Sequence, residues 1–340
     1  MTFKGWETAT IYSDDGAQVD AIQPVIVSAS RSTDIPAFHH QWFFDRLMKG
    51  YVVWTNPFNR SQQYVSFSKT RVFVFWTKNP EKFMLRLSEL DEKNINYYFQ
   101  FTLNDYDKDG LEPNVPPLQK RLDIFRRLSE KIGSGRVVWR FDPLLTTDRI
   151  SSQALLDKVA KVAGELKNHT QRLITSFADI ENYKKVERNL DKAGIKWKNF
   201  AENEVPIIAK GLKQIGEQFG LEVLTCSEKM DLSEFGVAHA KCVDGDLMAN
   251  LFPGDVELMR FLGHDNYAGS LFPSFQGGVS EKLKDKGQRK ECGCIVSKDI
   301  GQYDTCLHLC TYCYANSSAE NVKRNFSQKP DRDCESILCL

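Results

Sequence analysis

The sequence predicts an α/β fold, a partial or full TIM-like β/α barrel. Seven runs rich in β-branched and aromatic residues recur along the 340 residues, and most are separated by stretches with helical periodicity. Runs that are apolar on both faces are typical of parallel strands buried between layers, and crossover helices connect such strands. A doubly wound open sheet is the rival, but no Gly-rich phosphate loop follows any of the runs.

The elements alternate along the chain. The predicted strands are Pro24–Ala29, Arg71–Trp76, Tyr97–Leu103, Arg136–Phe141, Arg172–Phe177, Leu221–Thr225 and Cys294–Lys298. The predicted helices are His39–Lys49, Glu81–Leu90, Pro117–Ile132, Ser151–Leu166, Val205–Phe219 and Asn316–Phe326. We expect a single domain, residues 1–340, in which 244–287 is an insertion, 292–316 a cysteine-rich loop and 327–340 a tail.

Charge and composition narrow the function classes. Lys plus Arg and Asp plus Glu both number 45, so no global charge favours a nucleic-acid or membrane surface. No apolar leader or membrane-spanning stretch is present, which predicts a cytoplasmic protein without membrane partners. In that reducing compartment, nine cysteines are better explained as metal ligands or buried thiols than as disulfides.

Polar residues lie within or just after several predicted strands. In β/α barrels the chemistry collects at the carboxyl ends of the strands. Arg31, Lys78 and Arg140 are therefore candidate catalytic residues that could bind a carboxylate or phosphate. Gln100 and Ser176 could donate hydrogen bonds to a cofactor. Each of these side chains could equally be a helix cap or half of an ordinary ion pair.

The last predicted strand runs into a loop that carries Cys306, Cys310 and Cys313, here called the cysteine loop. Three thiolates on one loop can hold an iron-sulfur cluster and leave one iron open. An open coordination position is typical of catalytic metal sites. Zinc is the alternative, with His308 as a fourth ligand, although His308 lies two residues from both Cys306 and Cys310, an awkward spacing for one ion.

The spacing of the three cysteines, with Tyr312 directly before the third, resembles the radical S-adenosylmethionine signature. The resemblance implies a 4Fe-4S cluster on these cysteines, S-adenosylmethionine on the open iron and Tyr312 beside that cofactor. It also implies a low-potential electron donor, such as ferredoxin or flavodoxin, and a radical that abstracts hydrogen from a small-molecule substrate. That superfamily places the loop after its first strand, so the order here is permuted, which a closed sheet tolerates because its last strand neighbours its first.

The whole chain also resembles a bacterial and archaeal family, domain of unknown function 1848, which carries such a C-terminal cysteine cluster. The resembling segments are Ser28–Pro36, Phe75–Pro80, Arg140–Pro143 and Asp299–Asn316. The second and third are also similar to segments of spore photoproduct lyase and its relatives. Neutral net charge does not support a nucleic-acid substrate, but it does not exclude one.

Four other cysteines predict a second metal site. They are Cys226, Cys242, Cys292 and Cys294, here called the four-cysteine group. A structural zinc ion or an auxiliary iron-sulfur cluster would fit four thiols, whereas ordinary buried thiols are the simpler alternative. Two other functions stay open for the whole chain: an iron-sulfur electron-transfer or regulatory protein, and a zinc-dependent hydrolase.

Overall fold

The computed structural model describes residues 3–226, 228, 230–264, 283–327 and 334–338. Its main sheet has eight strands in the order β13-β12-β10-β8-β7-β6-β3-β14, and all neighbours are parallel. The strands are β3 (Ile26–Ala29), β6 (Val72–Thr77), β7 (Asn96–Thr102), β8 (Val137–Leu144), β10 (Arg172–Phe177), β12 (Glu222–Thr225), β13 (Ala238–His239) and β14 (Lys298–Asp299).

The structure confirms the predicted parallel sheet but does not confirm that the sheet closes into a barrel. β14 begins four residues later than the predicted strand at Cys294, and β13 was not predicted. The edge strands β13 and β14 do not pair with each other in the described residues, so no closed barrel forms there. Each edge strand has only two residues, which is too short for an extended ladder between the edges.

Four predicted helices are confirmed nearly to the residue: α2 (His40–Lys49), α4 (Leu118–Ile132), α5 (Ser152–Glu165) and α7 (Glu204–Phe219). The helix predicted after β6 is split into η1 (Phe83–Arg86) and α3 (Ser88–Glu92), and the last helix, α10, spans Ala319–Ser327. The prediction missed α1 (Ile35–Phe38), α6 (Lys184–Lys192), α8 (Gly245–Leu251), α9 (Val256–Leu262), η2 (Ser134–Arg136) and η3 (Ser233–Phe235).

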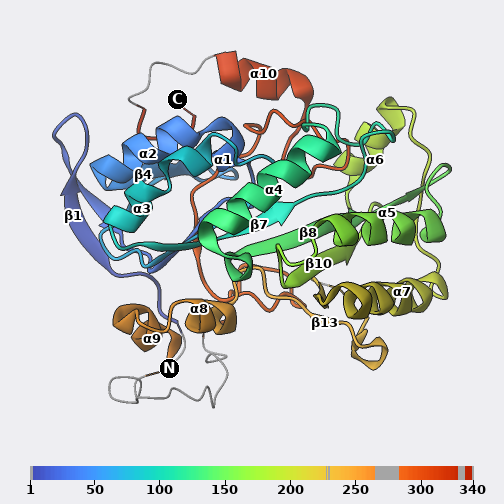
Figure 1. The fold of residues 1–340 in the computed structure, drawn as a ribbon. Coiled ribbons are helices and arrows are strands. Elements are labelled where there is room, and N and C mark those ends of the chain that lie inside the picture. Colours follow the sequence, from blue (N-terminus) through green and yellow to red (C-terminus); the bar gives the residue numbers. More distant parts are fainter. Residues whose placement is uncertain (1–2, 227, 229, 265–282, 328–333, 339–340) are drawn as a thin grey trace.

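Long helices lie along the strands of the main sheet, as Figure 1 shows for α4, α5 and α7. Helices α8 and α9 lie apart from them, near the N-terminus. These two helices occupy the first part of the stretch predicted as an insertion, and residues 265–282 of that stretch lie outside the described residues.

A small second sheet, also missed by the prediction, has the order β1-β2-β5-β4. Its strands are β1 (Thr8–Tyr12), β2 (Gln18–Ile22), β4 (Tyr51–Thr55) and β5 (Gln62–Ser66). The two remaining strands, β9 (Thr146–Thr147) and β11 (Trp197–Lys198), pair with each other. The small sheet braces the end of the main one, because the Trp54 indole donates to the Gly301 carbonyl (3.1 Å) and lies under the Lys298 ammonium.

Alternation along the strands gives the main sheet two different faces. In β8, Val137 and Trp139 join a large apolar core that includes buried residues of α4, α5 and α7. Val138 joins a smaller core with residues of α8 and α9 and with three cysteines of the four-cysteine group. We call this second side the inner face; Arg140 follows Val138 on it, two residues nearer the carboxyl end of the strand.

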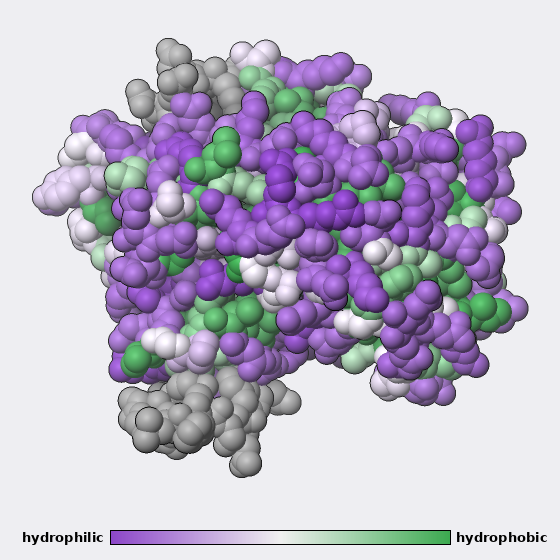
Figure 2. Space-filling model, in the orientation of Figure 1, coloured by the Kyte–Doolittle hydropathy of each residue, from purple (hydrophilic) through white to green (hydrophobic). Residues whose placement is uncertain are grey.

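The surface seen in Figure 2 is mainly hydrophilic, with apolar residues in small separate patches. Within the described part of the chain, no helix combines the length and apolar character that a membrane crossing requires.

Candidate metal and cofactor site

The position of the cysteine loop is set by β14. This strand pairs in parallel with β3, so that Asp299 lies opposite Ser28. The Asp299 carboxylate accepts hydrogen bonds from the backbone N–H of Arg31 and of Gly301, each at 2.8 Å. A side chain at Gly301 would place its Cβ 1.8 Å from Ser30 Oγ, so only glycine fits. The exits of β3 and β14 are thereby held together, and the cysteine loop leaves the sheet at the carboxyl edge.

The cysteine loop presents three thiols that lie close enough to interact electrostatically with one another. Burial raises the pKa of Cys306 and Cys313, while the nearby backbone N–H groups of His308 and Ala315 favour negative charge on these two sulfurs. Such N–H donors stabilise negative charge on sulfur, which suits thiolates bound to a metal. Burial raises the pKa of Cys310 to about 12, so a metal would have to displace the thiol proton.

A fully buried carboxylate, Glu112, lies beside the loop. It accepts hydrogen bonds from Lys78 Nζ (2.7 Å), from Asn104 Nδ2 (3.0 Å) and from the Tyr312 hydroxyl, and Arg121 Nη1 lies 3.4 Å away. Burial raises the pKa of Glu112, but the charges of Lys78 and Arg121 outweigh burial and hold it below its usual value. Glu112 therefore stays charged and anchors both Lys78 and Tyr312.

His308 is engaged away from the thiols. Its Nε2 lies 2.9 Å from Asp34 Oδ2, and its Nδ1 lies 3.4 Å from the Asn114 carbonyl oxygen. Asp34 also accepts from the backbone N–H of Lys78 and caps α1. Because contacts occupy both ring nitrogens, a Cys3His zinc site would require this buried network to break.

The sequence-predicted side chains divide into two groups. Lys78 and Tyr312 lie at the cysteine loop, with the Lys78 Nζ 3.0 Å from the Tyr312 hydroxyl. Arg140 and Gln100 instead lie at the four-cysteine group: Arg140 Nη1 donates to Cys242 Sγ (2.8 Å), and Gln100 Nε2 donates to the Cys242 carbonyl (3.0 Å).

Arg31 also faces the four-cysteine group, where Cys294 is its strongest charged neighbour. Its guanidinium lies 5.3 Å from the centre of the Trp76 ring. Ser176, by contrast, lies between the two groups and donates to Asp142.

A chain of hydrogen bonds joins the two groups. Arg140 Nη2 donates to Asp142 Oδ2 (2.7 Å), and the Asp142 N–H donates to Asn104 Oδ1 (2.9 Å). Asn104 Nδ2 in turn lies 3.1 Å from the Tyr312 hydroxyl. The polar residues at the strand ends, predicted to form one site, thus form two linked sites.

The four-cysteine group is brought together from distant parts of the sequence. Cys226 Sγ and Cys242 Sγ are 3.5 Å apart, the Val243 N–H next to Cys242 donates to Cys294 Sγ (3.3 Å), and Cys242 and Cys292 lie close enough to Cys294 to act on it electrostatically. Within the described ranges, no three His, Cys, Asp or Glu side chains already surround a common point as a metal would require. Metal binding at either group would therefore need side-chain rotations. Cys334, left unassigned by the sequence, is disulfide-bonded, contrary to the expectation for the cysteines as a set.

Sequence reasoning missed Glu112 and Arg121. Glu112 lies in the loop after β7 among several acidic residues, Asp105, Asp107 and Asp109, and nothing in its local pattern distinguishes it. Arg121 lies in α4, where an arginine is normally solvent-exposed. Only the fold reveals that the side chain of each is fully buried.

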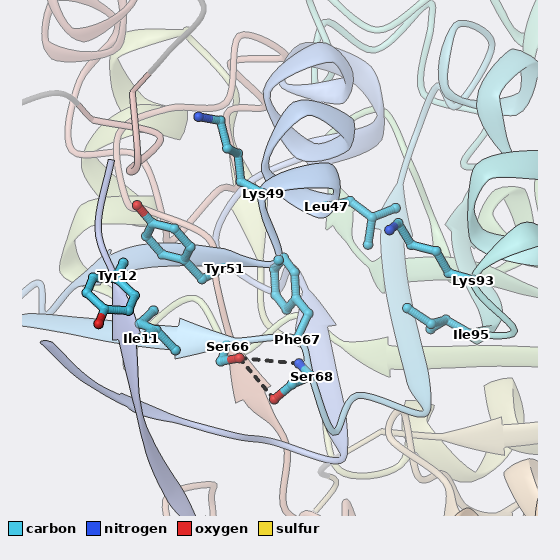
Figure 3. Close-up of a pocket in the computed structure, with 11 residues that line it drawn as sticks. Ile11, Tyr12, Leu47, Lys49, Tyr51, Ser66, Phe67, Ser68, Lys93 and Ile95 are labelled. Carbon is cyan, nitrogen blue, oxygen red and sulfur yellow. Dashed lines mark hydrogen bonds between the residues drawn. The ribbon is translucent and has the colours of Figure 1, made fainter. Parts of the chain in front are cut away.

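A hollow of about 420 Å³ lies elsewhere, between the small sheet and α2 (Figure 3). Apolar side chains line it together with two lysines, Lys49 and Lys93, and its lining includes none of the candidate site residues. We therefore place the candidate site at the cysteine loop rather than at this hollow.

Comparison with known proteins gives one match. Neither the curated proteins nor the solved structures contain a significant match to this chain. A family model described as Domain of unknown function (DUF1848) matches residues 26–315, from the start of β3 through the cysteine loop. The matched stretch includes both groups of cysteines and every strand of the main sheet. The chain therefore belongs to the family of domain of unknown function 1848.

Proposed function

We propose that this protein is an iron-sulfur enzyme of the radical S-adenosylmethionine type, with a 4Fe-4S cluster on Cys306, Cys310 and Cys313. The observation that carries the proposal is the place of β14 at the edge of the sheet, parallel to β3. If β14 stood first in the chain, the strands would follow one another in consecutive order and the cysteine loop would follow the first strand. That is the arrangement the resemblance implies, so the sheet would work as a permuted partial barrel.

The donor set fits such a cluster. Three thiols lie near one another on one loop, where side-chain rotations could bring them to one cluster, and nearby backbone N–H groups favour negative charge on two of the sulfurs. With three thiolate ligands, one iron would remain open for S-adenosylmethionine. When bound, this pair would supply reductive cleavage of the sulfonium and a radical able to abstract hydrogen from a small-molecule substrate.

The chain's own residues would bind and orient the cofactor. The Lys78 ammonium has three protons, and its hydrogen bonds in the described structure go to Glu112 and Tyr312. One proton therefore stays available for a carboxylate beside the loop. Glu112 keeps the ammonium charged in this buried place, because the two opposite charges offset the cost of desolvation. Tyr312, fixed by the same carboxylate, would form one wall of the cofactor site.

The test uses the full chain, purified without oxygen and reconstituted with iron and sulfide. Dithionite and S-adenosylmethionine are added, and 5′-deoxyadenosine is measured by chromatography. We expect 5′-deoxyadenosine from the wild type and from the control Lys161→Met, an exposed lysine on α5, but none from the triple variant Cys306→Ala, Cys310→Ala, Cys313→Ala.

An intact cluster that gives no 5′-deoxyadenosine would favour an electron-transfer or regulatory protein. Zinc in place of iron in the cysteine loop would favour the hydrolase. A flavodoxin or ferredoxin that replaces dithionite would support the expected low-potential electron donor.

A further inference from the structure

The four-cysteine group lies where the two edges of the main sheet approach each other. Cys242 follows the edge strand β13, and Cys294 precedes the opposite edge strand β14. The two segments are in direct contact, because the Ile295 N–H donates to the Val243 carbonyl (3.1 Å) and the Val243 N–H donates to Cys294 Sγ (3.3 Å). The thiols are therefore the groups that face each other across the gap of the open barrel.

Two arginines direct positive charge at these thiols. Arg140 donates to Cys242 Sγ, and Arg31 has Cys294 and Cys242 among its neighbours. The Nη2 of Arg31 is buried and has no hydrogen-bond partner in the described part of the chain. A buried guanidinium nitrogen without an acceptor is costly, and uncharged thiols are only weak acceptors. A centre with negative charge on sulfur would satisfy it.

The backbone supplies further donors to the same sulfurs. The Val243 N–H donates to Cys294 Sγ (3.3 Å), and the Cys294 N–H lies close enough to Cys292 to favour negative charge on its sulfur. Three of the four cysteines are at least 95% buried, which keeps water away from the group. The environment thus resembles that of bound thiolates more than that of isolated core cysteines.

The distance between two of the four sulfurs favours a single metal ion over a cluster. In a tetrahedral site with zinc–sulfur bonds of about 2.3 Å, neighbouring sulfurs lie about 3.8 Å apart. Cys226 Sγ and Cys242 Sγ are 3.5 Å apart. In a cubane cluster each thiolate binds a different iron, so the inorganic core would hold the thiolates farther apart. Among divalent metals that accept four thiolates, zinc binds more tightly than ferrous iron.

We propose a second metal site that holds one zinc ion through four thiolates, those of Cys226, Cys242, Cys292 and Cys294. One zinc with four thiolates carries a net charge of −2 (+2 − 4), which Arg31 and Arg140 offset in part, since Arg140 also pairs with Asp142. The ion clamps the β13 edge of the sheet to the β14 edge, which the two-residue edge strands cannot do by pairing. It therefore fixes the strand from which the cysteine loop emerges, and through Arg140 and Asp142 it is joined to the network around Glu112.

The test does not depend on the cluster proposed for the cysteine loop, because it uses the triple variant Cys306→Ala, Cys310→Ala, Cys313→Ala. The full chain is purified without added iron or sulfide, and its metals are measured by mass spectrometry. We expect about one zinc per chain, with four sulfur neighbours at about 2.3 Å in X-ray absorption. Cobalt substituted for zinc should give the intense visible bands of a tetrahedral thiolate site.

A triple variant without zinc would overturn the proposal, and so would one that holds iron with acid-labile sulfide, or zinc with nitrogen or oxygen neighbours. Cys226→Ser with Cys242→Ser should lose the zinc; if this variant does not fold, the measurements on the triple variant decide. Arg31→Met should release zinc to a chelator several-fold faster than the exposed control Arg188→Met. Equal release rates would contradict the role given to Arg31.

Discussion

At the scale of single residues, burial decides what a charge does. Glu112 and Arg121 have fully buried side chains, and Lys78 is nearly so. Such charges are stable only as a set, because removal of one leaves the others desolvated and unpaired. The same side chains on the surface would contribute little.

We expect Glu112→Gln to lower the free energy of unfolding by roughly 3 kcal/mol, because Lys78 and Arg121 lose their buried counter-charge. Urea titration followed by circular dichroism measures the change. The control is Glu81→Gln, whose partly exposed pairs with Lys120 and Arg127 should cost less than about 1 kcal/mol. Similar losses of unfolding free energy in the two variants would mean that the buried charge of Glu112 does not stabilise Lys78 and Arg121.

The substitution Lys78→Met should weaken S-adenosylmethionine binding to the reconstituted protein about tenfold, because a charged hydrogen bond contributes on the order of 1.5 kcal/mol or more. Circular dichroism first checks that the variant folds, because Glu112 loses one of its buried partners. Equilibrium dialysis gives the affinity, and the control is Lys161→Met, an exposed lysine on α5. An unchanged affinity for S-adenosylmethionine would mean that Lys78 does not bind this cofactor.

The ionisation of the Asp14 carboxyl group should make the stability of the fold depend on pH. Burial raises the pKa of Asp14, but hydrogen bonds from Arg46 and Tyr51 outweigh it and hold the pKa below the usual 3.8. The folded state therefore favours the charged form, and its contribution is present above pH 3.8 and is lost as the pH falls below that value. Because Asp14 is one-quarter exposed, the contribution is discounted to about 1–2 kcal/mol.

Accordingly, Asp14→Asn should be less stable than the wild type by that amount at pH 7, and the difference should shrink steadily as the pH falls below 3.8. Urea titrations at several pH values measure it, and Asp20→Asn, an exposed aspartate on β2, is the control. A difference that does not change with pH would assign the effect to packing instead of charge.

At the scale of elements, β14 has only two residues but sets the position of the cysteine loop. Two residues pair with β3, and contacts of Asp299, Gly301 and Trp54 hold the chain that follows. Sequence analysis placed the strand earlier, over Cys294–Lys298, because those residues are more apolar. In the structure, Cys294 belongs to the four-cysteine group and does not take part in the pairing of β14 with β3.

Gly301→Ala tests this element. The added Cβ would lie 1.8 Å from Ser30 Oγ and 2.5 Å from Ser30 Cβ, so the exits of β3 and β14 must separate. We expect a loss of roughly 3 kcal/mol in the free energy of unfolding and reduced iron incorporation. Gly254→Ala, where nothing lies within 4 Å of the new Cβ, is the control. Ser30→Gly added to Gly301→Ala should restore part of the loss; no restoration would place the strain elsewhere.

At the scale of the whole molecule, Cys334 and Glu335 contact residues from the first part of the sequence. The Val53 N–H on β4 donates to the Glu335 carbonyl, the Trp42 indole on α2 donates to the Cys334 carbonyl, and the Asp14 N–H donates to the Glu335 carboxylate. The described part of the predicted tail is thus docked on the small sheet and α2.

Removal of residues after Ser327 should lower the melting temperature by roughly 5–10 °C, since at least four hydrogen bonds of about 1 kcal/mol each are lost, that from the Tyr51 hydroxyl to Glu335 included, together with the buried Ile337 side chain. Differential scanning calorimetry measures the shift. Far-ultraviolet circular dichroism at low temperature should be almost unchanged, because the main sheet does not include this segment. An unaltered melting temperature would show that the docking contributes nothing to stability.

The sequence by itself determined the parallel α/β class, six of the seven predicted strand positions and the loop of three cysteines, because each is a local pattern of apolar period or residue spacing. The small sheet and the helices α8 and α9 were not predicted, since short strands and short helices carry weak patterns. The resemblance to domain of unknown function 1848 rested on local motifs and was confirmed by the family match.

The tertiary structure alone decided which side chains meet. It paired β14 with β3, brought Cys226 to Cys242 and buried Glu112 between Lys78 and Arg121. It also separated Arg140 and Gln100 from the cysteine loop and engaged His308 with Asp34. These contacts join residues far apart in sequence, and strand order sets their proximity, which no local pattern of residues encodes.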